Sequence, residues 1–579
     1  MALPLISIAG IISCLAIALS VFGMTVSRLF RWRWILQQGP GICAVIGLAG
    51  TILFLELWNF FYPVSHSSVA VLAAVTLVFA LIFRRTLLAT VRAWIRRRSI
   101  VVSVLLLLLL FTVSLFGLGP SEYRHFDTGL YYLNSIRWAH EFPVIPGLAN
   151  LHSRLGYNQS LFLFVAFLSS AGNLGLARAC QLVNPLFVFV CGWAILDQLR
   201  LNLTTAKAMR IRLYAILLLC PLFFLGSHIL ISAATADIAA AGFALAGSLA
   251  FVSCLEETAA RNASPAGNWL LVVTVCVCTL IKLKLSYAVL GGIALFFATI
   301  VLLVFRRNFV SAWIQAGVLA IILVVPWSVR GVVLSGFPFY PSTVIRFRTD
   351  WATPKRAADS ERRWIASWAK EPNEDPVNVL GNNAWFTPWL ERNVQDPENI
   401  LLFVFVTGGL VALVLSLVLP TKREHEIVAA LLMGQSLLAV FFWFQTAPEP
   451  RFGYASLLLV YVSGFYAFVS AILGFSNARA SVCACVIAFG SILLISIPQF
   501  RAIENCDKKF PHGFPEAQLK YKITDSGLVV GVPVDSLAWN NGLIATPYFN
   551  RHLALRGRDV RDGFRINGTA PKTQQKPAK

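Results

Sequence analysis

The feature that most constrains this chain is a recurring apolar run of roughly 20 residues, long enough to cross the hydrocarbon core of a bilayer. Charged residues make up only 13% of the 579 residues, about half the fraction of a typical soluble protein. We therefore predict an all-α polytopic membrane protein with about 12–14 transmembrane helices. The expected spans lie near residues 2–24, 40–62, 68–83, 99–118, 180–199, 213–232, 237–254, 268–284, 286–305, 311–329, 401–419, 427–446, 453–473 and 481–498.

Clusters of arginine predict how these spans are oriented. Arg28, Arg31 and Arg33 follow the first run, and the segment RRTLLATVRAWIRRR (84–98) follows the third. Arginine-rich loops stay on the cytoplasmic side, and an amphipathic basic segment can also lie on the anionic inner leaflet. The arginines of 84–98 could equally well serve only to set the orientation of the spans, without binding the lipid surface. We attribute the net charge of +21 to topology and to phosphate-bearing lipids, not to nucleic acid.

The apolar segment 161–172 is too short to cross comfortably, and we interpret it as an interfacial or re-entrant helix. With that choice both termini and the long polar segments fall on the outer face. The predicted domains are a transmembrane domain (1–498) with outer loops at 119–160 and 330–400, and a C-terminal periplasmic region (499–568). That last region should be small and α+β, with a strand at 527–534, and it precedes a disordered tail (569–579).

The 119–160 loop holds the densest group of reactive side chains. Asp127 stands just outside a span and could act as a general base on a sugar hydroxyl, or could bind a divalent cation such as Mg²⁺ or Mn²⁺. The alternative is that Asp127 caps the following helix. The histidines have no fixed ligand spacing, so hydrogen bonding within the loop suits them better than metal ligation.

Charged residues from distant stretches are expected at the same interface. Charges in apolar surroundings usually face a cavity or one another, although snorkelling and simple ion pairing are alternatives. The candidates in spans are Asp237, Lys282, Lys284, Arg330 and Arg451. The candidates in the loop are His125, Asp127, Arg137, His152, Arg154 and Asn158.

Several of these residues lie in motifs that resemble known proteins. HFDTGLYY (125–132), PGLANLHSRLG (146–156) and ATPYF (545–549) resemble a set of uncharacterised bacterial multi-pass inner-membrane proteins, over most of the chain from about residue 100. KLS (284–286), Arg330 before SGFPFYP, and PEPRFGY (448–454) resemble the GT-C superfamily of integral-membrane glycosyltransferases. In the uncharacterised multi-pass proteins, a histidine is common at the position of Tyr132, and this departure weakens a metal site at this position.

The resemblance implies a GT-C-like enzyme that moves a sugar from a polyprenyl-phosphate donor to a glycan or lipid acceptor, in cell-surface polysaccharide biosynthesis. The active face would be periplasmic, and no cofactor is certain beyond a possible divalent cation. Asp127 would be the base, with Asp237 and His125 orienting it or the acceptor. A transporter or flippase of lipid-linked oligosaccharide, a polysaccharide polymerase or ligase, and a non-catalytic assembly protein remain open.

Two sets of loop and span residues have roles in this expectation. Lys284, Arg330 and Arg451, with Lys282, would hold the donor phosphate, because a cationic clamp neutralises a departing phosphate. Arg137, His152, Arg154 and Asn158 would contact the acceptor or shape the loop.

The predicted topology is testable with fusion reporters. A reporter placed after Arg98 should be cytoplasmic, because the preceding arginines hold that end inside, and one placed after Gln499 should be periplasmic. Finding both reporters on the same side would contradict the predicted number of crossings.

Overall fold

The structure, a computed structural model, describes residues 2–97, 99–119, 125–200, 206–259, 263–305, 310–419, 423–473, 477–504 and 513–567. Within these ranges, 13 helices are long and apolar enough to cross a membrane, and a bent pair would make a fourteenth. The predicted all-α polytopic architecture is confirmed. The tail predicted to be disordered lies outside the described residues.

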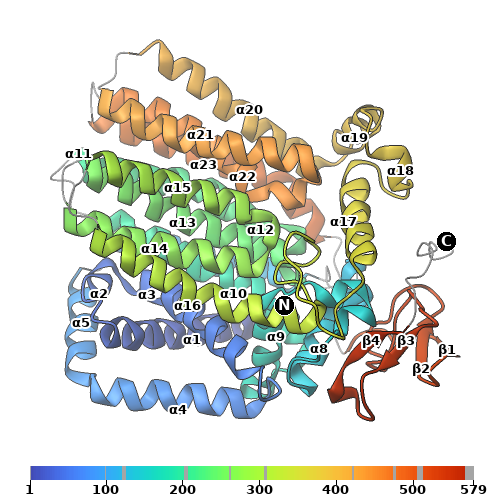
Figure 1. The fold of residues 1–579 in the computed structure, drawn as a ribbon. Helices are drawn as coiled ribbons and strands as arrows, with labels where there is room; N and C mark the ends of the chain where they lie inside the picture. Colours follow the sequence, from blue (N-terminus) through green and yellow to red (C-terminus); the bar gives the residue numbers. More distant parts are fainter. Residues whose placement is uncertain are drawn as a thin grey trace.

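The spanning helices follow the predicted apolar runs in order (Figure 1). They are α1 (Ala2–Leu29), α3 (Pro40–Trp58), α6 (Ile100–Gly117), α10 (Leu176–Asp197), α11 (Ala206–Leu217) with α12 (Leu219–Ser227), α13 (Ala236–Ala259), α14 (Ala263–Leu283), α15 (Ala288–Phe305), α16 (Val310–Ser335), α20 (Pro397–Leu417), α21 (Arg423–Thr446), α22 (Pro450–Leu473) and α23 (Asn477–Glu504).

The basic segment after the third run forms its own helix. Helix α4 (His66–Ile82) and helix α5 (Arg84–Arg96) meet at an angle of 86°, so α5 turns away from the direction of the spans. The Trp94 indole of α5 donates to the Leu36 carbonyl oxygen at 2.9 Å, which holds α5 against the short helix α2 (Ile35–Gln38). A basic helix running across one end of the bundle is the arrangement expected of an amphipathic surface helix.

The short apolar segment forms helix α9 (Ser160–Ser170), which has only 11 residues. It packs against α3, α8 (Leu133–Glu141) and α10, and nearly all of its residues are buried. Helix α9 is therefore enclosed by the bundle and has no broadly exposed face.

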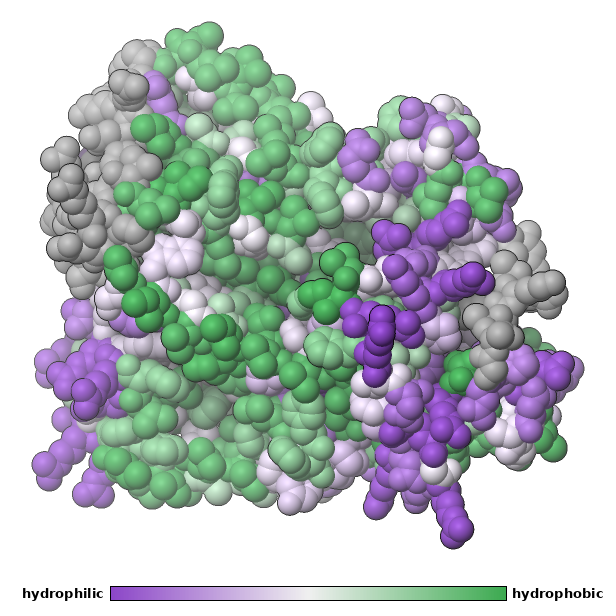
Figure 2. Space-filling view, viewed as in Figure 1, coloured by the Kyte–Doolittle hydropathy of each residue, from purple (hydrophilic) through white to green (hydrophobic). Residues whose placement is uncertain are grey.

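Polar segments from three parts of the chain gather at one end of the bundle (Figure 1). This polar cap consists of residues 125–160, 336–396 and 513–567. Its elements include α8, α17 (Lys355–Lys370), α18 (Pro376–Val379) and α19 (Phe386–Asn393). Figure 2 shows hydrophilic side chains concentrated over this end, beside a broad apolar surface along the helices.

The C-terminal part of the cap contains two small antiparallel sheets. Strand β1 (Leu519–Ile523) pairs with β2 (Val529–Pro533), and β3 (Leu553–Leu555) pairs with β4 (Phe564–Ile566). The strand predicted at 527–534 is β2. Its Val530 packs with Leu553 and Phe564 of the second hairpin in a buried apolar cluster.

Direct contacts join the three segments of the polar cap. The Asn150 side-chain amide donates to the Trp351 carbonyl at 2.8 Å and to the Phe564 carbonyl at 3.2 Å. Arg556 is ion paired with Asp350 at 2.7 Å. The prediction that the two long loops and the C-terminal region share one face therefore agrees with these contacts.

Two glycines allow α20 and α22 to cross closely. A Cβ at Gly464 would lie 1.9 Å from the Gly409 carbonyl oxygen, and a Cβ at Gly409 would lie 2.6 Å from the Tyr461 Cα. Small residues at such crossings let backbones approach, which drives association of helices in lipid.

This crossing predicts the effect of a single methyl group. Gly464→Ala should destabilise the protein by about 1–3 kcal/mol, because the methyl group would overlap the backbone of α20. The measurement is the thermal unfolding midpoint of purified protein in detergent. Gly490→Ala is the matched control, since nothing lies within 4 Å of a Cβ there. Equal midpoints for the two variants would contradict the described crossing.

Candidate functional site

Asp127 lies at the base of the polar cap, directly before the one-turn π-helix Thr128–Tyr132. Its side chain makes no capping hydrogen bond to that helix. Instead Oδ1 accepts from Arg154 Nη1 at 2.7 Å and Oδ2 accepts from Arg451 Nη2 at 3.2 Å. The capping alternative is therefore wrong, and Asp127 joins the loop to the start of α22.

His125 is the second loop residue at this place. Its Nε2 accepts from Arg451 Nη1 at 2.8 Å, and its ring stacks on Tyr132 with centroids 5.3 Å apart. Burial lowers the pKa of His125 to about 4, so the ring is neutral at physiological pH and can accept that hydrogen bond.

A second ion pair lies beside the first. Lys284, in the break between α14 and α15, is paired with Asp237 at the start of α13. Thr235 Oγ1 donates to Asp237 Oδ2 at 2.8 Å. Lys284 Nζ also lies 4.0 Å from the centre of the Phe452 ring, and Arg451 Cζ lies 5.2 Å from it. The Phe452 ring thus contacts both cations.

Glu361 of α17 completes the site and was missed by sequence reasoning. It accepts from Ser153 Oγ at 2.8 Å and from the Tyr157 hydroxyl, and it lies 3.7 Å from Arg154 Nε. The highly charged sequence around it indicates an exposed surface helix, yet Glu361 is buried. We call the whole set the charged cluster, comprising His125, Asp127, Arg154, Asp237, Lys284, Glu361 and Arg451.

The ion pairs determine the protonation state of Asp127. Burial alone would raise its pKa, but Arg451 and Arg154 outweigh burial and lower the pKa of Asp127 to about 2. The carboxylate is therefore ionised at physiological pH. With both arginines in place it is a weak base, because little free energy favours its protonation.

An apolar groove lies beside Phe452. Its space, open side included, is about 520 Å³. Residues of the start of α15, of α21 and of α22 line it, among them Leu285, Leu290, Phe442, Trp443, Phe452 and Ser456. Phe442 is exposed on the outer surface of the helix bundle. Phe452 is therefore shared between an apolar groove and the two cations of the charged cluster.

Comparison with known proteins gives a family. A family model described as a domain of unknown function (DUF8201) matches residues 5–458. The chain belongs to the DUF8201 family. The match includes every member of the charged cluster and ends before the strands of the polar cap. Neither a curated protein nor a solved structure matches this DUF8201 chain.

The four cations expected to share a phosphate do not lie together in this DUF8201 fold. Arg451 and Lys284 belong to the charged cluster. Lys282 is ion paired with Glu56 at 3.1 Å, and both side chains are fully buried. Arg330 donates to Asn59 Oδ1 at 3.3 Å and to Asn158 Oδ1 at 2.6 Å. Lys282 and Arg330 have no contact partner in common with Lys284 among the described residues.

The remaining loop candidates hold the cap together. Arg137 is paired with Glu141 at 3.3 Å and donates to the carbonyl oxygens of Asn540 and Asn541. His152 accepts from the Arg154 backbone at 3.1 Å, and its ring contacts Tyr548 with centroids 5.1 Å apart. Burial lowers the pKa of His152 to about 3, so this ring is neutral too.

The metal alternative for Asp127 has little support from its neighbours. Among the described residues, no three His, Cys, Asp or Glu side chains converge as a metal site. Both oxygens of Asp127 are bonded to arginines. A divalent cation at Asp127 would have to displace both guanidinium groups.

The low pKa of Asp127 predicts a pH-dependent contribution to stability. The shift from 3.8 to about 2 corresponds to about 2 kcal/mol. Because the folded pKa is the lower one, this stabilisation is complete above about pH 4 and is lost as the pH falls through about 2. Asp127→Asn should therefore unfold at a lower temperature than wild type at pH 7, and the difference should shrink below pH 4.

The substitution has a cost for folding because two arginines would lose their anion. Asp525→Asn is the control, because its pair with Arg551 is largely exposed and such pairs contribute little. A difference between Asp127→Asn and wild type that stays constant from pH 7 to pH 2 would contradict the ion-pair account.

Proposed function

We propose that this protein is a GT-C-like glycosyltransferase that moves a sugar from a polyprenyl-phosphate-linked donor to a glycan or lipid acceptor. It would act on the periplasmic face of a bacterial inner membrane, in cell-surface polysaccharide biosynthesis. The observation that carries the proposal is an apolar groove lined by Phe452, whose ring also contacts the cationic groups of Lys284 and Arg451. A ligand matching this arrangement has an apolar chain and an anionic head, as a polyprenyl phosphate does.

The phosphate would lie between Lys284 and Arg451. In the structure these cations are paired with Asp237 and Asp127. The phosphodiester of a sugar-loaded donor carries one negative charge, as a carboxylate does, but its oxygens can accept from both cations at once, so it competes with the two separate carboxylates. Arg451 can bind a phosphate through two parallel N–H groups, while Lys284 acts as a point charge.

Donor binding would also prepare the base. When Arg451 turns to the phosphate, Asp127 loses one of the two cations that depress its pKa. The pKa of Asp127 then rises toward the ordinary range, and the carboxylate becomes a better proton acceptor. This explains why a carboxylate with a pKa of about 2 in the free protein is suited to base catalysis in the complex.

The chemical step follows from these positions. Asp127 takes the proton of an acceptor hydroxyl, and the acceptor oxygen forms a bond to the anomeric carbon of the sugar. The bond between that carbon and the phosphate oxygen breaks, and its electron pair stays with the phosphate. Lys284 and Arg451 stabilise the charge that develops there. Neutral His125, bonded to Arg451, would keep the guanidinium aimed at the phosphate.

Binding of polyprenyl phosphate to the purified full chain in lipid nanodiscs tests the phosphate site. Lys284→Met and Arg451→Lys should each weaken binding by about 1.5–3 kcal/mol, the scale of hydrogen bonds to charged groups. That is about 10–150-fold in Kd. Lys370→Met is the matched control, because Lys370 also lies over an aromatic ring, at 4.7 Å from the Trp385 centre, but outside the charged cluster.

Unchanged binding in both cluster variants would contradict the proposed donor site. Asp127→Asn separates an enzyme from a flippase. It should bind polyprenyl phosphate at least as tightly as wild type, because it removes the carboxylate that competes for Arg451. It should also lose release of polyprenyl phosphate from a sugar-loaded donor. Retained release would exclude Asp127 as the base, and transport of the loaded lipid without release would favour the flippase.

A further inference from the structure

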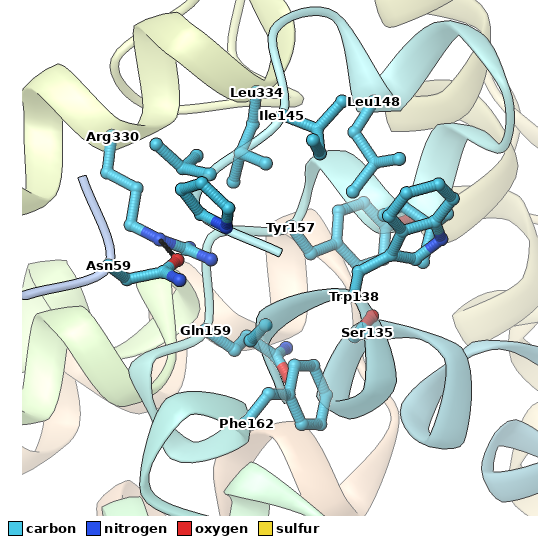
Figure 3. Close-up of a pocket in the computed structure, with 14 residues that line it drawn as sticks. Asn59, Ser135, Trp138, Ile145, Leu148, Tyr157, Gln159, Phe162, Arg330 and Leu334 are labelled. Carbon is cyan, nitrogen blue, oxygen red and sulfur yellow. Dashed lines mark hydrogen bonds between the residues drawn. The ribbon is translucent and has the colours of Figure 1, made fainter. Parts of the chain in front are cut away.

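A second cavity lies between the end of α3, helix α8, the start of α9 and helix α16 (Figure 3). Its space, open mouth included, is about 390 Å³. Its polar and aromatic lining includes Asn59, Ser135, Trp138, Tyr157, Gln159 and Arg330. We call it the Arg330 cavity. Figure 3 shows Arg330 and Asn59 at one side of it, with Ser135 and Trp138 at the other.

Arg330 is buried, with 8% of its surface exposed, and its two hydrogen-bond partners are neutral. They are the side-chain oxygens of Asn59 and Asn158. A guanidinium has five N–H donors, so these two bonds use only part of its capacity. Arg330 is therefore a buried cation with no anion among the described residues bonded directly to it, which is unusual because buried charges are normally paired.

The nearby carboxylate of Glu56 attracts the Arg330 guanidinium, but its direct bonds go to other groups. Glu56 is bonded to Lys282 at 3.1 Å and to Ser160 at 2.6 Å. Glu56, Lys282 and Arg330 together carry one formal negative and two formal positive charges. The buried group therefore has an excess of one positive charge, in a part of the protein where the low dielectric makes that excess costly.

Two further donors face the same cavity. Ser135 and Trp138 stand three residues apart on α8, so their side chains share one face of the helix. Neither Ser135 Oγ nor Trp138 Nε1 has a hydrogen-bond partner among the described residues, and both atoms are buried. Buried polar atoms are normally bonded. A cation and two unbonded donors that line one cavity call for an acceptor with negative charge.

We propose that the Arg330 cavity binds a small oxyanion, a carboxylate or a phosphate, through Arg330, Ser135 and Trp138. The site is separate from the proposed donor site, because among the described residues Arg330 has no hydrogen-bond or ion-pair partner in common with Lys284 or Arg451. Tyr157 lines the cavity and donates to Glu361 of the charged cluster, so the two sites are neighbours. The inference does not depend on glycosyl transfer.

The test uses the full chain in nanodiscs of zwitterionic lipid, at constant ionic strength maintained with chloride. The probes are inorganic phosphate and glucuronate, with glucose as the uncharged comparison. We expect saturable binding of an anion, read by calorimetry and as a rise in unfolding temperature, and none for glucose. Tighter binding of glucuronate identifies a carboxylate carried on a sugar as the ligand, and tighter binding of phosphate identifies the free ion.

Three variants assign the binding to this cavity. Arg330→Gln should weaken it at least tenfold, and Trp138→Phe should weaken it severalfold while keeping a ring in place. Arg362→Gln should bind as wild type does, because that arginine is exposed on α17. If Arg330→Gln does not fold, Trp138→Phe decides. Absence of saturable anion binding in wild type, or unchanged binding in Trp138→Phe, would overturn the proposal.

Discussion

The ion pairs of Asp127 with Arg154 and Arg451 are the interaction on which the polar end of this protein depends. The three residues come from places 27 and 324 positions apart along the chain. Their charges are removed from most of the solvent, and such charges are costly unless each has a close partner. Mutual neutralisation therefore fixes where the first long loop, the start of α22 and, through Arg154, helix α17 meet.

The same charges explain why a site lies here. Lys284 and Arg451 both contact the Phe452 ring, and the same ring lines an apolar groove between the bundle helices. Lys284 and Arg451 therefore lie next to the place where an apolar chain in the groove would end. In our proposal the internal carboxylates hold these cations until a lipid phosphate replaces them. The ion pairs would then stabilise the site before the lipid binds, and binding of the lipid phosphate would leave Asp127 able to act as a base.

The fold was largely predictable, because runs of apolar residues and clusters of arginine report directly on a bilayer. The pairing of charges was not. Lys282 and Lys284 are two residues apart, yet Lys282 pairs with Glu56 of α3 and Lys284 with Asp237 of α13. Because residues two positions apart do not share a helix face, different partners are expected for these two lysines. Which partners they find depends on tertiary packing, which the sequence does not show. Tertiary packing also explains why Arg330 and Lys284 do not share a site, although the sequence predicts that they do. Glu361 could not be identified from the sequence because the charge pattern of its helix predicts exposure.

The most direct test of the central claim is a structure of the protein in nanodiscs with polyprenyl phosphate bound. The account predicts a phosphate in contact with both Lys284 and Arg451, an isoprenoid chain along the groove beside Phe452, and Asp127 released from Arg451. A structure in which the phosphate binds elsewhere, while Asp127 keeps both arginines, would contradict it.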